Sequence, residues 1–186
     1  MSGQSIILNN ERSFILKKLS SNDGKNLGNF FNSLLPETRS RFAPHPLTFE
    51  YAALLCDEEQ STDTAERFIL WDNKLIAGYF ILEFRIPDHE AKRYSEYGIM
   101  LEQGKDVMFA PCVADSYQDR GLASLVMDIL LEHCRKRECR SLVLLGGTQE
   151  SNARAIRFYE KFGFIPCGGY HTEVYNIDMR LIIENS

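Results

Sequence analysis

The chain has 186 residues, 25% of them charged, and a formal net charge of −5. This length suits one domain with a sizeable core, and the negative charge predicts no general attraction to nucleic acid or anionic membranes. No apolar run approaches the roughly 20 residues of a membrane span, and residues 1–5 lack the pattern of a secretion signal. Five cysteines without framework spacing indicate reduced thiols. We therefore expect a cytoplasmic protein.

The first part of the chain predicts one strand and two helices. Residues 12–19 predict the strand, and the turn after it offers Asp23 as a helix cap. Apolar residues at helical spacing follow and end at Pro36: Leu27, Phe30, Phe31, Leu34 and Leu35. Residues 38–46 predict an irregular connector, after which Thr48 would cap a second helix.

Two apolar runs, residues 67–71 and 74–84, predict a β-hairpin. The residues between them, Asp72-Asn73, are typical of a two-residue turn. Glu83 places a carboxylate near the end of the second run. Its alternation with apolar neighbours also fits a solvent-facing position.

The middle of the chain combines a long connection with an unusual strand. Residues 85–105 are longer than most connections between strands. They predict either another strand at residues 97–101 or a flap beside a ligand site. Residues 107–113 predict a buried strand that contains Pro111. Because proline donates no ladder hydrogen bond, we expect an edge, an end or a bulge there.

A turn from Gln118 to Ala123 separates this strand from an amphipathic helix. The buried face of the helix is predicted at Leu122, Leu125, Val126, Ile129, Leu130 and Cys134. The first N–H groups of a helix lack intrahelical partners and, together with the helix dipole, attract an anion such as a pyrophosphate. Gly121 would let the backbone approach the phosphates without an intervening Cβ, and Ala123 keeps the turn small.

The last third predicts a strand, a helix and two closing strands. Residues 141–146 form the predicted strand. The helix would be capped by Ser151 or Asn152 and would end at Gly163. The closing strands are predicted at residues 164–169 and 175–183. This order of elements predicts an α+β fold.

Two segments resemble the signatures of the GNAT superfamily of N-acetyltransferases. Gln118-x-x-Gly121-x-Ala123 resembles the family's acetyl-CoA pyrophosphate loop, and residues 152–164 resemble its second signature. Both occur in the family's order and separation. The resemblance implies a single N-acetyltransferase domain over residues 1–186 with acetyl-CoA as co-substrate. It also implies a three-layer α/β arrangement: a mixed, mostly antiparallel central sheet that is flanked by helices and splayed between its central strands.

The resemblance assigns cofactor contacts to three groups of residues. Backbone groups at the end of the strand would pair with the pantetheine amides: Cys112, Val113 and Ala114. The turn would hold the pyrophosphate through Gln118, Asp119, Arg120, Gly121, Leu122, Ala123 and Ser124. The second signature would contact the cofactor, including its pantetheine arm, through Asn152, Ala155, Phe158 and Lys161.

Acetyl transfer to an amine requires a neutral nucleophile, a polarised carbonyl and a proton for the departing thiolate. A lysine-like amine has a pKa near ~10.4, so a base or a desolvating site must remove its proton. The resemblance implies that Tyr159 protonates the thiolate, although this residue also fits a core tyrosine. It implies that Glu83 acts as base, directly or through water. A backbone N–H of Cys112 or Val113 would stabilise the oxyanion. Direct transfer is favoured over an acyl intermediate on Cys112.

The acceptor site falls in segments outside the close resemblance. The family places the loop containing Phe42 and His45 beside the acceptor, so Phe42 is a candidate substrate contact. General preferences favour core packing for Phe42 and a loop position for His45. His171 would line the acceptor site or lie in a turn. The cysteines and histidine near residues 133–139 lack zinc-site spacing, so we expect no metal.

We therefore expect an acetyltransferase that acts on a primary amine of a small molecule or amino-acid-like acceptor by direct attack in a ternary complex. A peptide or protein acceptor, modified at its N-terminus or at lysine, is the alternative. A non-catalytic acetyl-CoA sensor is the third possibility. No nucleic-acid or membrane partner is expected, and the chain would be a monomer or a homodimer.

Overall fold

The computed structural model describes residues 4–8, 12–58 and 64–184. Contacts group the chain into two compact units. The first comprises residues 1–82 and 111–129, and the second comprises residues 83–110 and 130–186. The single domain over residues 1–186 stays a prediction. No helix in the described part of the chain is both long enough and apolar enough to cross a membrane.

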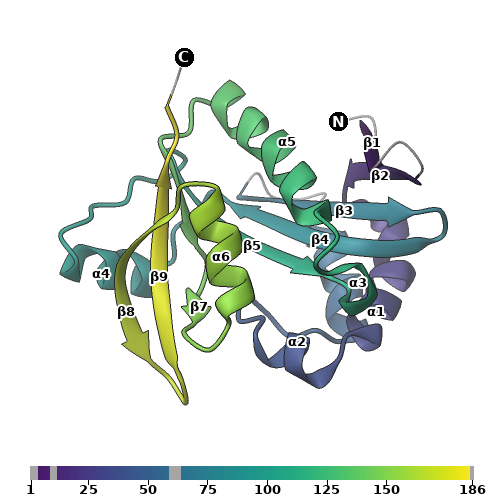
Figure 1. Cartoon of the computed structure of the whole chain (residues 1–186), viewed down its shortest axis with the longest axis horizontal. Helices are drawn as coiled ribbons and strands as arrows, with labels where there is room; N and C mark the ends of the chain where they lie inside the picture. The colour runs from purple at the N-terminus through teal and green to yellow at the C-terminus, as the bar shows by residue number, and fades with distance from the viewer. Residues whose placement is uncertain (1–3, 9–11, 59–63, 185–186) are drawn as a thin grey trace. The chain divides into compact units, whose positions relative to one another are not determined.

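The strands of the first unit neighbour one another in sequence order, β1-β2-β3-β4 (Figure 1). Their bounds are β1 Gln4–Leu8, β2 Arg12–Lys18, β3 Ala65–Asp72 and β4 Leu75–Glu83, whose last residue begins the second unit. β2 pairs antiparallel with β1 and with β3, where Leu16 lies opposite Leu70. Both of these leucines are buried, so this pairing builds the core of the unit. The strand predicted at residues 12–19 is confirmed as β2, although the sequence did not predict β1 before it, and both runs of the hairpin are confirmed.

The hairpin turn lies one residue later than predicted. Its residues are Asn73 and Lys74, and Asn73 adopts a left-handed conformation with φ 53°. Asp72 remains in β3, where its buried carboxylate accepts a hydrogen bond from the Tyr117 hydroxyl at 2.6 Å. Asparagine tolerates positive φ at low cost. The tertiary hydrogen bond therefore keeps Asp72 in the strand, and Asn73 takes the first turn position.

The helices of the first unit follow the predicted order, with one addition. They are α1 Gly24–Ser33, α2 Pro36–Ser40 and α3 Phe49–Glu58. Thr48 caps α3, since its hydroxyl accepts the Tyr51 N–H at 3.1 Å. The expected irregular connector instead begins inside α2. Pro36 explains this, because proline has the backbone angle of a first helical residue and needs no N–H there.

Asp23 does not cap α1 as predicted. It precedes the helix, but its side chain makes no capping hydrogen bond to α1. Its carboxylate instead accepts the Ser20 N–H at 2.9 Å and binds the Lys17 ammonium at 2.8 Å. The lysine on β2 therefore diverts the carboxylate from the helix end.

The second unit holds mixed strands in the order β5-β6-β9-β7, with β8 beside β9. Their bounds are β5 Asp106–Val113, β6 Ser141–Leu144, β7 Thr148–Gln149, β8 Ile165–His171 and β9 Tyr175–Ile182. β5 and β6 are parallel, and β9 is antiparallel to β6, β7 and β8. Residues 111–113 of β5 belong to the first unit. The expected fold class, a mixed and mostly antiparallel sheet with helices, is confirmed.

The long connection of residues 85–105 contains a helix, α4 Asp88–Glu96, and no strand. The strand predicted at residues 97–101 is therefore wrong. Ile86 and Tyr94 instead join Met108 and Val143 in a buried cluster. The alternating apolar residues after α4 pack against that cluster as irregular chain: Tyr97, Ile99 and Leu101. These residues alternate because one side of the segment packs against the cluster, although the segment pairs with no neighbouring strand.

Candidate active site

The turn expected to hold a pyrophosphate is an exposed bend between two helical segments. A 3-10 turn over Asp115–Tyr117 precedes it, and α5 (Leu122–Lys136) follows it. Asp119 and Gly121 both have positive φ, 58° and 78°. A Cβ at Gly121 would meet no heavy atom within 4 Å. The space beside this backbone is thus open to a ligand.

The start of α5 directs backbone donors toward this bend. Ser124 and Leu125 donate to the Gly121 carbonyl at 3.1 and 3.2 Å. Leu122 and Ala123 precede the first of these bonds, so their N–H groups belong to the helix end that lacks intrahelical acceptors. The Leu122 side chain is buried and anchors the helix. The geometry can therefore hold an anion at the helix start.

The end of β5 is already engaged within the first unit. The Val113 carbonyl accepts the Gln118 side-chain amide at 2.9 Å. Ala114 donates its N–H to the Ala77 carbonyl at 2.9 Å and accepts the Tyr117 N–H at 2.8 Å. The pairing expected between Ala114 and pantetheine stays a prediction that these bonds do not favour.

Cys112 is buried, and its surroundings keep the thiol protonated. Burial, with a smaller contribution from the Asp115 carboxylate, raises the pKa of Cys112 to about 12. Since the thiolate is the nucleophilic form of cysteine, the thiol is inert near neutral pH. This geometry disfavours an acyl intermediate on Cys112.

Phe42 and His45 lie in one aromatic cluster with Phe31, Tyr51 and Tyr79. The His45 ring stacks on Tyr51 at 5.0 Å and meets Phe42 edge-on at the same distance. His45 Nδ1 lies 2.9 Å from the Pro46 carbonyl, which can only accept, so Nδ1 carries the proton. Nε2 then accepts from the Tyr79 hydroxyl at 3.1 Å. Phe42 is half-buried, which fits both packing and a place beside an acceptor.

The second unit holds the residues of the second signature at the start and along one side of α6 (Ala153–Lys161). Asn152 caps this helix, since its side chain accepts the Ala155 N–H at 3.3 Å. Tyr159 is 7% exposed, with its ring 5.3 Å from those of Phe158 and Phe164. Tyr159 is therefore packed by aromatic rings, as the core interpretation also expects.

The remaining predicted site residues are more exposed. Glu83 is half-buried, and its carboxylate accepts the Arg85 N–H at 3.2 Å. Lys161 is exposed, with its ammonium 5.5 Å from the centre of the Phe162 ring. Asp119 and Arg120 are exposed on the turn. His171 is exposed too, but it is the last residue of β8 and lies opposite Tyr175 of β9, so the alternative of a turn position is wrong. All of the assigned site roles stay predictions.

A buried charge cluster in the second unit was missed by sequence reasoning. Arg93 on α4 binds the Asp178 carboxylate at 2.7 and 3.0 Å and also pairs with Glu90. Its guanidinium lies 4.1 Å from the centre of the Tyr170 ring, whose hydroxyl donates to the Gly146 carbonyl at 2.6 Å. Burial raises the pKa of Glu90 despite the nearby Arg93. The cluster stabilises the turn before β7, and no local pattern predicts pairing across 85 residues.

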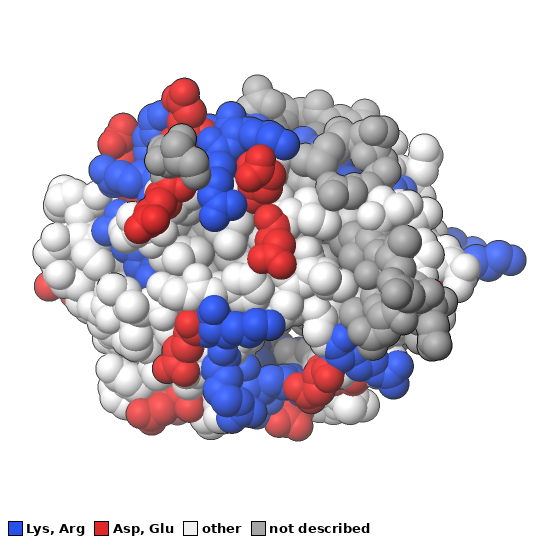
Figure 2. Space-filling model, turned by 45° about the horizontal axis from the view of Figure 1, so that its top comes forward, with Lys and Arg blue, Asp and Glu red and all other residues white. Residues whose placement is uncertain are grey.

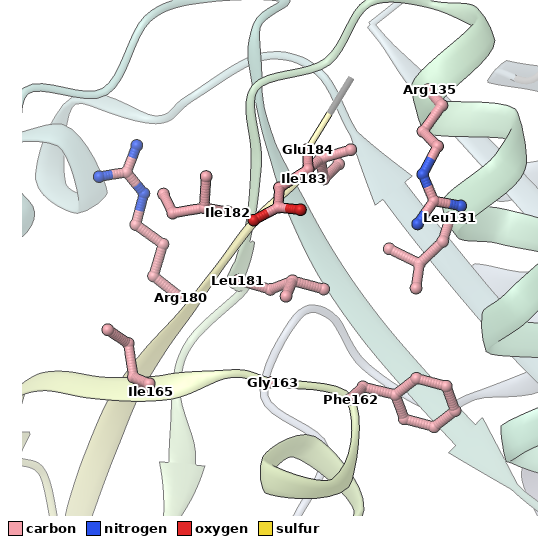
Figure 3. Close-up of a pocket in the computed structure, with 10 residues that line it drawn as sticks. All are labelled: Leu131, Arg135, Phe162, Gly163, Ile165, Arg180, Leu181, Ile182, Ile183 and Glu184. Atoms are coloured by element: carbon pink, nitrogen blue, oxygen red, sulfur yellow. The ribbon is translucent and has the colours of Figure 1, made fainter. Parts of the chain in front are cut away.

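A separate pocket of about 390 Å³ lies within the second unit (Figure 3). Its lining contains none of the predicted site residues: Leu131, Arg135, Phe162, Gly163, Ile165, Arg180, Leu181, Ile182, Ile183 and Glu184. Leu131 and Leu181 face the hollow, whereas Arg180 points away from it. The Arg180 guanidinium binds the buried side chains of Asp106 at 3.1 Å and Ser141 at 3.0 Å. Its polar contacts therefore lie in the core of this unit.

Charges of both signs are interspersed on the face drawn in Figure 2. Along α5, Glu132 lies 3.8 Å from Arg135 and 3.4 Å from Lys136. Within the described ranges, no group of three or more His, Cys, Asp or Glu side chains could hold a metal ion. The expectations of no metal and no nucleic-acid partner stay predictions.

A family model described as the acetyltransferase (GNAT) family matches residues 30–164. No curated protein gave a significant sequence match.

Solved structures with a similar fold include three acetyltransferases. Ribosomal-protein-S5-alanine acetyltransferase from Vibrio fischeri has a TM-score of 0.73 and 12% identity, covering 98% of both chains. Spermidine N-acetyltransferase from Vibrio cholerae, in complex with CoA and spermine, has a TM-score of 0.69 and 17% identity, covering 92% of this chain and 96% of the other. The putative acetyltransferase yncA from Salmonella typhimurium, with acetyl-CoA, has a TM-score of 0.68 and 14% identity, covering 93% and 95%. At these identities the likeness shows the fold.

Proposed function

The chain belongs to the GNAT family of acetyltransferases, and on that premise we propose that it transfers an acetyl group from acetyl-CoA to a primary amine of a small-molecule or amino-acid-like acceptor. Membership confirms the expected enzyme class and its co-substrate, acetyl-CoA. The proposal adds the kind of acceptor, the direct attack in a ternary complex and the residues in their roles.

The open backbone at Gly121 is the observation that carries the proposal. A diphosphate needs several N–H donors and room for its oxygens, and the bend at the start of α5 offers both. The exposed Arg120 on the same bend adds a positive charge that backbone groups lack. In the proposed mode, residues 118–124 hold the diphosphate of acetyl-CoA, and Asn152 contacts its pantetheine arm.

In the proposed reaction, the lone pair of the amine attacks the thioester carbonyl carbon. A backbone N–H of Cys112 or Val113 stabilises the oxyanion. The carbon–sulfur bond then breaks, and Tyr159 gives its proton to the departing thiolate. The proton of the attacking amine passes to Glu83, directly or through water. The raised pKa of Cys112 supports direct transfer, since a protonated thiol is a weak nucleophile.

A peptide or protein acceptor is the second candidate. The structural likeness extends both to a spermidine N-acetyltransferase and to a ribosomal-protein-S5-alanine acetyltransferase, so it supports either class. Release of free thiol from acetyl-CoA, measured across a panel of amines, amino acids and peptides, would separate the two. A non-catalytic sensor would release none with any of them. The cytoplasmic location and the monomeric or homodimeric state also remain proposals.

The role of Tyr159 is tested with Tyr159→Phe, which retains the aromatic ring and removes the hydroxyl. We expect turnover to fall by roughly 100-fold, the lower end of the effect of a general acid. Binding of acetyl-CoA, measured by calorimetry, should remain within about twofold, because the ring still packs against Phe158 and Phe164. Phe164→Leu, which disturbs the same packing at a residue with no assigned contact to the cofactor, serves as the packing control. Unchanged turnover in Tyr159→Phe would remove this residue from the mechanism.

A further inference from the structure

Three side chains link α2 to the residues around the bend, and we call them the Thr38–Asp115–Gln118 cluster. The Thr38 hydroxyl donates to Asp115 Oδ1 at 2.6 Å. It also accepts from Gln118 Nε2 at 3.3 Å. One hydroxyl thus donates and accepts at once, which orients all three side chains in a directed chain of hydrogen bonds.

The Gln118 amide is already fully used as a donor. Besides Thr38, its Nε2 binds the Val113 carbonyl at 2.9 Å. An amide nitrogen has two N–H groups, so both are occupied within the protein. A phosphate oxygen could bind this nitrogen only by displacing a protein partner. The side chain of Gln118 therefore holds the bend, and its contribution to ligand binding comes through the backbone.

The Asp115 carboxylate binds α2 with one oxygen and the residue directly before α2 with the other. Oδ1 accepts from Thr38, and Oδ2 accepts the Leu35 N–H at 2.9 Å. Both oxygens therefore accept hydrogen bonds from neutral donors, which fix the orientation of the carboxylate without removing its charge. Asp115 can thus act as a fixed support for the bend that follows it in sequence.

α2 is itself fixed, so it can act as a support. Arg39 on this helix donates to the carbonyls of Phe31 and Leu47, the latter at 2.6 Å. These carbonyls belong to the end of α1 and to the connector before α3. The residue next to Thr38 therefore ties α2 to both of its flanking segments.

We propose that Thr38 and Asp115 are positioning residues that, with the side chain of Gln118, preorganise residues 118–124 for the diphosphate of CoA. This inference rests on the proposed function of the same bend. Donors that are already in place need no ordering when the ligand binds, so the link raises affinity without touching the ligand.

The test compares Thr38→Val, which keeps the shape of the side chain and removes its hydroxyl, with Thr38→Ser, which keeps the hydroxyl. CoA binding is measured by calorimetry. We expect Thr38→Val to weaken CoA binding about tenfold, the scale of one hydrogen bond to a charged group. Thr38→Ser should bind CoA within about twofold of the parent chain. Ser40→Ala is the matched control: it removes another hydroxyl from α2, and CoA binding should be unchanged.

A second ligand separates positioning from general loss of structure. Pantetheine lacks the diphosphate, so its affinity, measured by NMR titration, should be the same in Thr38→Val and the parent chain. An equal loss for pantetheine and CoA would overturn the inference. If Thr38→Val does not fold, Gln118→Met tests the same hydrogen bond from its other partner. We expect Gln118→Met to weaken the binding of CoA and to leave that of pantetheine unchanged.

The proposed function and the inference fail in different ways. If the parent chain does not bind CoA, the proposed function is wrong and the inference falls with it. If the parent chain binds CoA and both Thr38→Val and Gln118→Met bind it equally well, the proposed function stands and the positioning role is overturned.

Discussion

The imidazole of His45 is kept neutral by its surroundings. Burial among aromatic rings lowers the pKa of His45 to about 4, even though the Pro46 carbonyl opposes this shift, and the Arg67 charge lowers it further. A neutral ring with a fixed tautomer can pack against Phe42 and Tyr51 without a counter-ion. His45 therefore titrates well below the pH at which a free histidine does.

This shift predicts a pH dependence of stability. Between pH 4 and 6.5, the unfolded chain binds more protons than the folded one, so stability rises with pH across this window. The contribution is complete above pH 6.5 and is lost as the pH falls toward 4. His45→Gln should reduce the slope of the unfolding free energy against pH, measured by urea titration. His171→Gln is the control for replacing a histidine at an exposed position. Equal slopes in His45→Gln and the parent chain would contradict the burial of a neutral imidazole.

At the level of elements, the aromatic ring of Tyr97, directly after α4, packs closely on Gly168 in β8. A Cβ at Gly168 would overlap the Tyr97 ring, which follows α4. The Tyr97 hydroxyl lies 3.1 Å from Asp178 Oδ2 and 3.2 Å from the Gly169 carbonyl, and its single proton is shared between these two acceptors, so the ring cannot move away without losing this bonding. Glycine is therefore required in β8 by the close approach of the ring.

Gly168→Ala should destabilise the chain by roughly 1–3 kcal/mol, the usual cost of overpacking a well-packed site. Gly24→Ala is the matched control, because a Cβ there meets its nearest heavy atom at 3.6 Å and the residue is helical. That control should be neutral or stabilise by up to about 1 kcal/mol. Urea denaturation of both variants checks the prediction, and equal stabilities would show that the ring yields without cost.

At the scale of the whole molecule, ligand binding to the folded chain adds to its stability by mass action. At a CoA concentration 100 times its Kd, the gain is about 2.7 kcal/mol. For a chain of this size, each kcal/mol shifts Tm by roughly 2–4 °C, so we expect Tm to rise by about 5–10 °C. A thermal melt with CoA, and with pantetheine at the same concentration as control, measures this. No rise with CoA would argue against a diphosphate site at residues 118–124.

Local patterns were sufficient where one segment sets its own structure. Residues 118–123 and the apolar stripe of α5 predicted both the bend and the helix, because helical spacing and positive-φ glycine act within a few residues. The cap of α6 by Asn152 was predicted as one of two alternatives for the same reason. The two motifs at their characteristic separation also predicted the family, and the match over residues 30–164 confirms it.

Only the tertiary structure decided what depends on partners distant in the sequence. Thr38 meets Asp115 across 77 residues, and Arg93 meets Asp178 across 85. Neither pair produces a periodic pattern in the sequence, because a single contact between distant residues requires no particular spacing of the residues around them. Residues 97–101 show the converse. Their apolar residues alternate along the chain, but these side chains pack against the buried cluster around Tyr94 and the segment forms no strand. Sequence thus determined the bend, and long-range contacts determined what holds the bend in place.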